Sequence, residues 1–278
     1  MPISGWQKFF KQFSKPSILP EAPRANAYME TLLLPSQHLG RDVLVDIYTP
    51  AYPDEHDVLP LLLFNDGQDL RQMQLLEVMK ASPLPFRAVG LHANERRLRE
   101  YGTAHQTDYA GRGDLAPSHT LFVTEELTAF LATRFPLPPR MTIAGFSLGG
   151  LSAFDIAWRH PARFQKVGVF SGALWWRSQP FSPQDPDGNR IVHTYVSQAA
   201  ECPPLQYWFQ TGTADETDDR NQNGVIDSID DTLDLIAALH KQGVPAEHIS
   251  YSEVEEGRHE PATWAVVLPE FVRWALDD

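Results

Sequence analysis

The sequence predicts an α/β fold in which a mainly parallel sheet is covered by helices on both faces. Two observations support this class. Short, nearly continuous apolar runs, such as LPLLLFND at 59–66, are typical of strands buried on both faces. Runs with helical spacing, such as SHTLFVTEELTAFLATRF at 118–135, lie between them. Because strands alternate with helices, we expect functional groups beyond the carboxyl ends of parallel strands.

Each element follows from its own pattern. Two early strands with a short connection, at 28–35 and 42–50, predict an antiparallel start to the sheet. Apolar runs predict the further strands, at 59–66, 86–92, 140–147, 166–172, 205–212 and 248–255. Helical spacing predicts helices at 70–81, 118–135, 148–160, 232–243 and 262–276. A long loop at 93–114 separates the fourth strand from the second helix.

An N-terminal segment, residues 1–27, precedes the main domain at 28–278. The stretch KPSILPEAP at 15–23 separates the two. The segment's aromatic residues share one face of a short predicted helix, formed by Trp6, Phe9, Phe10 and Phe13. We expect this segment to dock on the main domain; a dimer contact or a membrane-surface contact is the alternative.

Composition excludes several classes of function. The 278 residues include 42% hydrophobic residues, enough for a real core, and carry a net charge of −13. We therefore expect no nucleic-acid partner, because phosphate contact needs a basic face. No apolar run approaches the ~18–20 residues that span a membrane, and the N-terminus lacks a secretory signal. With Cys202 as the single cysteine, these features predict a cytoplasmic protein, and they indicate no oligomeric state.

A candidate nucleophile lies where a predicted strand meets a predicted helix. Gly145-Phe146-Ser147-Leu148-Gly149 is a G-x-S-x-G motif, and the strand–turn–helix context is the one that this motif requires. The serine at such a turn projects beyond the sheet, above a helix N-terminus that favours developing negative charge. We therefore interpret Ser147 as a nucleophile rather than as part of a purely structural turn.

A serine hydroxyl needs a base and an acid that orients the base. In this kind of fold the three residues follow one another along the chain in the order serine, acid, histidine. His259 lies between the last strand and the last helix, whereas His240 and His248 lie within predicted elements. Asp215 comes first after the strand at 205–212, and Glu216 is the alternative acid.

Two backbone N–H groups are expected to form an oxyanion hole. One belongs to Leu148, the residue after the nucleophile. Gln68, in the loop after the strand at 59–66, is the best candidate for the other, because Gly67 lets the chain turn there.

These motifs together resemble the putative-esterase family of α/β-hydrolases, over about residues 28–277. The resemblance depends on LLLFNDGQDL, R-x-x-E-Y at 97–101, IAGFSLGGLSA, FSGALWWRS, QTGTAD and GRHEPATW. The family includes enterochelin-esterase-like proteins, feruloyl esterases, S-formylglutathione hydrolases and mycolyltransferases, and SGALWW favours the enterochelin-esterase-like branch. The resemblance implies an α/β-hydrolase fold and an esterase domain, with Ser147, His259 and Asp215 as the triad and Gln68 and Leu148 as oxyanion donors.

Four further residues are candidates for substrate binding. Trp175 and Trp176 follow the strand after the nucleophile, where they could wall a pocket or pack in the core. Arg97 and Tyr101 lie in the long loop on the same side of the sheet, where they could contact substrate or hold the loop through an internal ion pair with Glu100.

An acidic stretch, DETDDRNQNGVIDSIDD at 215–231, contains the pattern of a twelve-residue calcium loop. Oxygen ligands belong at positions 1, 3, 5, 7, 9 and 12, with glycine at position 6. Counting from Asp219 fills these positions with Asp219, Asn221, Asn223, the Val225 carbonyl, Asp227 and Asp230, with Gly224 at the turn. Aspartate rather than glutamate at position 12 and the lack of a preceding helix depart from the usual pattern. We expect a structural Ca²⁺ ion here; the alternatives are a solvated acidic loop or an asparagine–glycine turn.

The sequence as a whole predicts a serine esterase that acts on a small-molecule ester and uses no organic cofactor. A calcium ion would hold the loop next to the catalytic acid. Two alternatives remain at this point. An acyltransferase would use the same triad with an alcohol in place of water, and a calcium-dependent binding module would not be catalytic.

Overall fold

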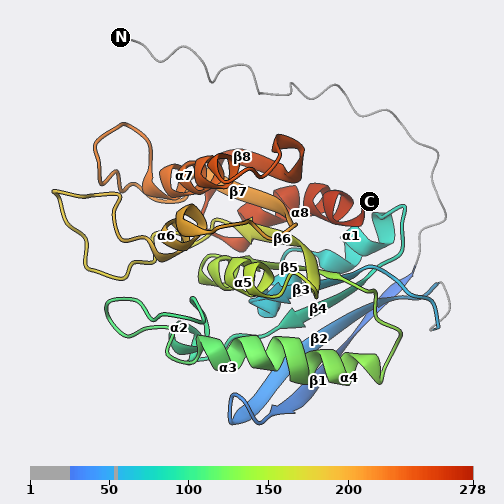
Figure 1. Cartoon of the computed structure of the whole chain (residues 1–278). Coiled ribbons are helices and arrows are strands. Elements are labelled where there is room, and N and C mark those ends of the chain that lie inside the picture. The colour runs from blue at the N-terminus through green and yellow to red at the C-terminus, as the bar shows by residue number, and fades with distance from the viewer. Residues whose placement is uncertain (1–25, 53–55, 278) are drawn as a thin grey trace.

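A computed structural model of the chain describes residues 26–52 and 56–277. Within them, eight strands form one sheet in the order β1-β2-β4-β3-β5-β6-β7-β8 (Figure 1). The strands are β1 (Ala27–Ser36), β2 (Arg41–Pro50), β3 (Leu61–Asn65), β4 (Arg87–Leu91), β5 (Met141–Phe146), β6 (Phe164–Phe170), β7 (Gln206–Ala214) and β8 (Ile249–Arg258). The predicted docking of the N-terminal segment lies almost entirely outside the described residues.

The strand directions confirm the predicted sheet. β1 pairs antiparallel with β2, and β2 pairs antiparallel with β4. Every later pair, from β4·β3 through to β7·β8, is parallel. β3, β4 and β5 are buried along their whole length, which explains their continuous apolar sequences.

Helices cover both faces of this sheet (Figure 1). One face packs against α1 (Leu75–Ala81) and α8 (Pro261–Leu276). The other face packs against α4 (Thr128–Ala132), α5 (Leu148–Arg159), α6 (Ile191–Gln198) and α7 (Asp227–Lys241). α2 (Arg97–Glu100) and α3 (Ala116–Leu121) lie on the same side as α5. No helix in the described part of the chain is long and apolar enough to cross a bilayer.

Several elements differ locally from the predicted ones. The helix expected at 118–135 contains a π-helical segment, Phe122–Leu127, where the Thr128 hydroxyl donates to the Val123 carbonyl five residues earlier at 2.9 Å. The helix expected at 70–81 begins only at Leu75, because Gln74 adopts a left-handed φ of 57°. The single-turn helix α2 and helix α6 were not predicted, since neither run is long enough for helical spacing to stand out.

The chain reverses its direction of travel across the sheet between β3 and β5. β4 lies on one side of β3, and β5 lies on the other. In open α/β sheets, the crevice at the carboxyl ends of two such strands is where ligands bind. A functional site is therefore expected in the loops that follow β3 and β5.

Candidate active site

Ser147 occupies a strained turn between β5 and α5. Its φ of 54° and ψ of −122° are unusual for a residue with a side chain, and such strain is typical of functional sites. The strand and helix cross so closely that a Cβ on Gly145 would lie 2.2 Å from the Gly149 carbonyl oxygen. Only glycine fits at position 145, and it places Ser147 partly exposed between the buried residues Phe146 and Leu148.

The two predicted oxyanion donors lie at the ends of the neighbouring strands β5 and β3. Leu148 is the first residue of α5, and Gln68 lies in the short helix Gly67–Leu70 that follows β3. The backbone N–H groups of Leu148 and Gln68 donate no hydrogen bond to any described residue. Both are therefore available to a negatively charged oxygen.

Asp215 directly follows β7, and one of its carboxylate oxygens is held by the backbone. Oδ2 accepts a hydrogen bond from the Gly212 N–H at 2.9 Å. Oδ1 is buried and has no partner that meets hydrogen-bond geometry. Burial raises the pKa of Asp215, while the Gly212 amide, the Ser171 hydroxyl and the positive form of His259 act in the opposite direction. One carboxylate oxygen is therefore free to receive a further hydrogen bond, and the charges of Asp215 and His259 influence each other's pKa.

His259 lies in the short connection between β8 and α8. Part of its ring is open to solvent, and the rest lies against protein, with the Trp264 ring 5.6 Å away at 82°. Partial burial lowers the pKa of His259; the charge of Asp215 opposes this effect, and that of Arg97 adds to it. No hydrogen bond joins the Ser147 hydroxyl to the His259 ring in the structure, and catalytic hydrogen bonds often tighten only when substrate binds.

Glu216, the alternative acid, faces a different part of the molecule. The Ser228 backbone N–H acts to lower its pKa, and the charges of Asp218, Asp227 and Asp231 act to raise it. Burial and these neighbouring acids raise the pKa of Glu216 to about 6. Of the two acids, Asp215 is therefore the one whose charge acts on the pKa of His259.

Arg97 joins the loop after β3 to the nucleophile turn. Its Nε and Nη2 atoms donate to the two oxygens of Asp66, both at 2.7 Å, and Nη2 also donates to the Phe146 carbonyl at 3.2 Å. Tyr101 is buried, and its hydroxyl accepts the Asp66 N–H at 3.1 Å. Glu100 is buried as well and pairs with Arg41, not with Arg97. Tyr101 and Glu100 therefore hold the loop in place. Arg97 holds Asp66, and its charge also lowers the pKa of His259.

The two adjacent tryptophans have different surroundings. Trp176 is completely buried and packs against Gly102 and Gly113, so it leaves no surface for a substrate to contact. Trp175 is 40% exposed and lies 5.2 Å from the Arg112 guanidinium. The structure favours the core-packing role for Trp176 and leaves Trp175 as the tryptophan that a substrate can reach.

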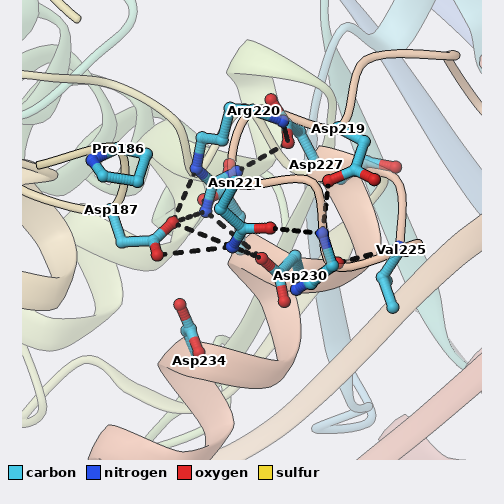
Figure 2. A network of polar contacts seen from close by, with 12 residues as sticks. Pro186, Asp187, Asp219, Arg220, Asn221, Val225, Asp227, Asp230 and Asp234 are labelled. Atoms are coloured by element: carbon cyan, nitrogen blue, oxygen red, sulfur yellow. Dashed lines mark hydrogen bonds and ion pairs between the residues drawn. The ribbon is translucent and has the colours of Figure 1, made fainter. Parts of the chain in front are cut away.

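The first half of the predicted calcium loop folds around Asp219. The Asp219 carboxylate accepts the backbone N–H groups of Asn223 at 3.1 Å and Gly224 at 2.9 Å, and the chain turns at Gly224 with a φ of 85°. Asn221 donates to Asp230 at 2.8 Å, so positions 3 and 12 of the predicted loop are in contact (Figure 2). α7 begins inside the loop, at Asp227, so a helix follows it and none precedes it.

Arginine side chains offset much of the charge in this acidic stretch. Arg220, whose side chain is only 5% exposed, contacts Asp187 and Asp231 at 2.8 Å and Asp227 at 3.1 Å (Figure 2). Arg190 pairs with Asp231 at 2.5 Å and with Asp234 at 2.6 Å.

The acidic side chains group differently from the sequence prediction. Among the described residues, the carboxylates that lie within 4.8 Å of one another are those of Asp187, Asp230 and Asp234. The sequence placed Asp230 with Asp219 and Asp227 instead. Asp187 could not be found by counting positions, because it comes from a separate loop between β6 and α6.

Three site residues were missed by sequence reasoning. Asp66 and Ser171 directly follow β3 and β6, so their place at the carboxyl edge of the sheet was a usable signal. Trp264 lies five residues after His259, in the first turn of α8, and only the structure shows that it contacts the site. A cavity of about 410 Å³ lies at the opposite edge, lined by residues that precede β3 and β5, and it contains no nucleophile.

The mainly parallel sheet and the strand–turn–helix around Ser147 define an α/β-hydrolase fold. The chain belongs to the family described as putative esterase, whose family model matches residues 36–275.

Individual relatives agree with this assignment. The iron(III) enterobactin esterase of Dickeya dadantii (strain 3937) is 25% identical over 289 residues, which cover 99% of this chain and 60% of the relative. The chain thus spans 60% of the length of that relative. Among solved structures, the enterobactin esterase of Shigella flexneri has a TM-score of 0.66 at 23% identity and covers 90% of this chain and 58% of that one. A ferulic acid esterase has a TM-score of 0.68 at 17% identity over 91% of this chain and 98% of its own.

Proposed function

We propose that the protein hydrolyses a carboxylic ester through Ser147, His259 and Asp215. Ser147 Oγ attacks the ester carbonyl while His259 removes its proton. The N–H groups of Leu148 and Gln68 stabilise the negatively charged oxygen of the tetrahedral intermediate. His259 then protonates the leaving alcohol, which leaves an acyl group on Ser147. Water, deprotonated by His259, releases the acid and restores the serine.

One observation supports this proposal above the others: Asp215, held by the Gly212 N–H with its Oδ1 free, is the acid whose charge acts on His259, whereas Glu216 is affected by other acids. Asp215 can therefore orient the imidazole and stabilise its positive form during the reaction. The strained backbone of Ser147 adds to this support, since it presents the hydroxyl at the carboxyl edge of the sheet.

The test compares wild type with Ser147→Ala on a panel of esters. The panel runs from short p-nitrophenyl esters to feruloyl and catecholate esters, and it includes enterobactin because a relative is named as an enterobactin esterase. We expect turnover by wild type and a loss of about 10⁶-fold in Ser147→Ala. Equal turnover by the two proteins would refute the mechanism. Product analysis with an added alcohol distinguishes hydrolysis from acyl transfer.

We also propose that the loop at 219–230 binds a structural Ca²⁺ ion. The ligands at its predicted positions are all hard oxygen donors, namely side-chain oxygens and the Val225 backbone carbonyl, and no histidine or cysteine lies among them, which suits Ca²⁺ and not zinc. The turn at Gly224 is already formed. Asn221 now directs its amide nitrogen at Asp230, and ligation requires its carbonyl oxygen instead, a difference of one amide flip. When bound, the ion would neutralise acidic charge and hold the chain after Asp215.

Calcium binding is tested by calorimetry and by thermal unfolding, with Ca²⁺ or a chelator present. At 100 times the dissociation constant, a ligand adds about 2.7 kcal/mol to the free energy of unfolding. For a protein of this size, that corresponds to a melting temperature higher by roughly 5–10 °C.

A pair of matched variants makes this test specific. Asp219→Asn keeps the acceptor for the Asn223 N–H but removes a charged ligand, so we expect it to lose the calcium-dependent shift in melting temperature. Asp218→Asn makes the same charge change at an exposed neighbour outside the predicted ligand set, so it should keep the shift. A wild-type melting temperature that is the same with Ca²⁺ and with chelator, together with no heat of binding, would contradict the proposal.

A further inference from the structure

Trp264 contacts three separate parts of the proposed active site. It lies in the first turn of α8 and is 5% exposed. Its ring meets the edge of His259 at 5.6 Å and 82°, and it stacks on Phe146 at 4.9 Å and 20°. Phe146 directly precedes the nucleophile Ser147. The third contact is polar: the indole Nε1–H donates to the Ser171 hydroxyl oxygen at 3.0 Å.

Ser171 lies between this tryptophan and the proposed catalytic acid. It directly follows β6, is 1% exposed and has a left-handed φ of 43°. Its backbone N–H donates to the Gln210 carbonyl of β7 at 2.7 Å, so the residue is anchored to the strand that carries Asp215. The Ser171 hydroxyl lowers the pKa of Asp215, and it makes no hydrogen bond to this carboxylate in the structure, where Oδ1 has no partner.

The direction of these hydrogen bonds is set by the donors available. An indole nitrogen can only donate, so the Ser171 oxygen must be the acceptor of the Trp264 contact. The single hydroxyl hydrogen of Ser171 is then free to point at Asp215. A hydroxyl rotates to suit its partners, and the indole donor restricts that rotation. The Trp264 contact thus leaves the hydroxyl hydrogen of Ser171 for Asp215, whose buried Oδ1 has no other hydrogen-bond partner.

We propose that Trp264 is a positioning residue that aligns the acid and the base of this site at the same time. Through the hydrogen bond to Ser171 it orients a hydroxyl that can donate to the free oxygen of Asp215, and through its ring contact it limits the movement of His259. This inference depends on the proposed Ser147–His259–Asp215 mechanism. It adds a buried supporting group that touches neither the substrate nor the reacting atoms.

The test uses three substitutions and one matched control. Trp264→Phe keeps an aromatic ring and removes only the N–H donor and the second ring, Ser171→Ala removes one oxygen atom, and a third protein combines both changes. The control is Trp274→Phe, the same substitution on the same helix. Trp274 packs on Trp208 and Phe271, at 5.8 and 5.7 Å, and contacts none of the proposed catalytic residues.

The measurements are kcat and KM on a p-nitrophenyl ester, the melting temperature, and the low-field ¹H resonance of the His259 ring N–H. We expect Trp264→Phe and Ser171→Ala each to lower kcat about tenfold with KM unchanged, the size of effect expected for one lost hydrogen bond. The double variant should be no slower than the slower single variant, because both substitutions interrupt the same series of contacts through Ser171. The low-field resonance should broaden or disappear in all three, and Trp274→Phe should keep wild-type kcat and resonance.

Three results would overturn the inference: wild-type kcat in both single variants, multiplying effects in the double variant, or an equal loss in Trp274→Phe. Ser171→Ala decides the question by itself if Trp264→Phe does not fold. Ser147→Ala separates this inference from the proposed function. If Ser147→Ala is inactive while the Trp264 and Ser171 variants match wild type, only the positioning role fails. If Ser147→Ala is active, the mechanism fails, and the positioning role with it.

Discussion

Replacing Asp215 and Glu216, one at a time, by the corresponding amides tests which of these two neighbouring acids serves the proposed mechanism. The changes are Asp215→Asn and Glu216→Gln. Each replaces one oxygen by an NH₂ group and removes one negative charge, so size and shape are nearly unchanged. The two proteins differ only in which carboxylate is lost.

For Asp215→Asn, the structure predicts a folded but nearly inactive protein. The amide oxygen can still accept the Gly212 N–H at the Oδ2 position, which directs the NH₂ group toward the buried Oδ1 position. A donor there cannot accept a hydrogen bond from the His259 ring, so it favours the wrong tautomer. In a well-studied serine protease this change lowers kcat about 10⁴-fold. We expect a loss of about 10³–10⁴-fold here, with a melting temperature close to that of wild type.

For Glu216→Gln, the structure predicts an active and slightly more stable protein. Burial and three nearby acids raise the pKa of Glu216 to about 6, above its ordinary value of 4.5. Because the folded state binds this proton more tightly, ionised Glu216 lowers the free energy of unfolding, and that loss develops as pH rises from about 4.5 to 6. At pH 7 we expect removal of the charge to add about 1 kcal/mol or less, since solvent screens a half-exposed group.

The assay is kcat/KM on a p-nitrophenyl ester at pH 7, with urea unfolding at pH 4 and pH 7. We expect Glu216→Gln to keep kcat within about twofold of wild type. Its stability gain should be present at pH 7 and absent at pH 4, below the ordinary pKa. The reasoning is refuted if Glu216→Gln loses activity while Asp215→Asn retains it.

Three further predictions concern the base, the nucleophile turn and a buried ion pair. Because the pKa of His259 is lowered and its neutral form is the base, kcat/KM should fall with decreasing pH through a pKa below 6.5, as a pH–rate series will show. Gly145→Ala places a Cβ 2.2 Å from the Gly149 carbonyl oxygen, so we expect a cost of about 1–3 kcal/mol or more and a large loss of fluorophosphonate labelling at Ser147. Arg41→Ala leaves Glu100, which is 2% exposed, without its partner, and should lower the free energy of unfolding by about 3–5 kcal/mol in urea titration.

The sequence predicted the sheet and the sharp turn at Ser147 well, because each depends on a local pattern of residues. Continuous apolar runs identified the strands β3, β4 and β5, and G-x-S-x-G marked the turn at Ser147 because two close-packed glycines flank a strained serine. Asp215 was preferred over Glu216 on chain order alone. In the structure Asp215 is held by the Gly212 N–H, whereas burial and the charges of Asp218, Asp227 and Asp231 act on Glu216; the choice of Asp215 as catalytic acid stays a prediction.

What the sequence could not supply are contacts between distant segments. Asp187 joins the acidic loop from another loop, 33 residues away from Arg220 along the chain. Trp264 and Ser171 are 93 residues apart, and although each stands in a motif that resembles the family, no spacing indicates that the two are in contact. Trp175 and Trp176 were equal candidates for substrate binding from their place in the sequence, and only the burial of Trp176 distinguishes them. Such pairings depend on how strands are ordered in the sheet, which periodicity does not report.

The order of the strands also affects which segments of this chain can change during evolution. Each site segment follows a different strand: Gln68 follows β3, Ser147 β5, Ser171 β6, Asp215 β7 and His259 β8. Backbone hydrogen bonds between neighbouring strands fix the spacing of these five anchor points, whatever the loops between them contain. The segments after Ser171 and after Asp215 can therefore lengthen, shorten or exchange sequence over evolutionary time while the reacting groups stay in register.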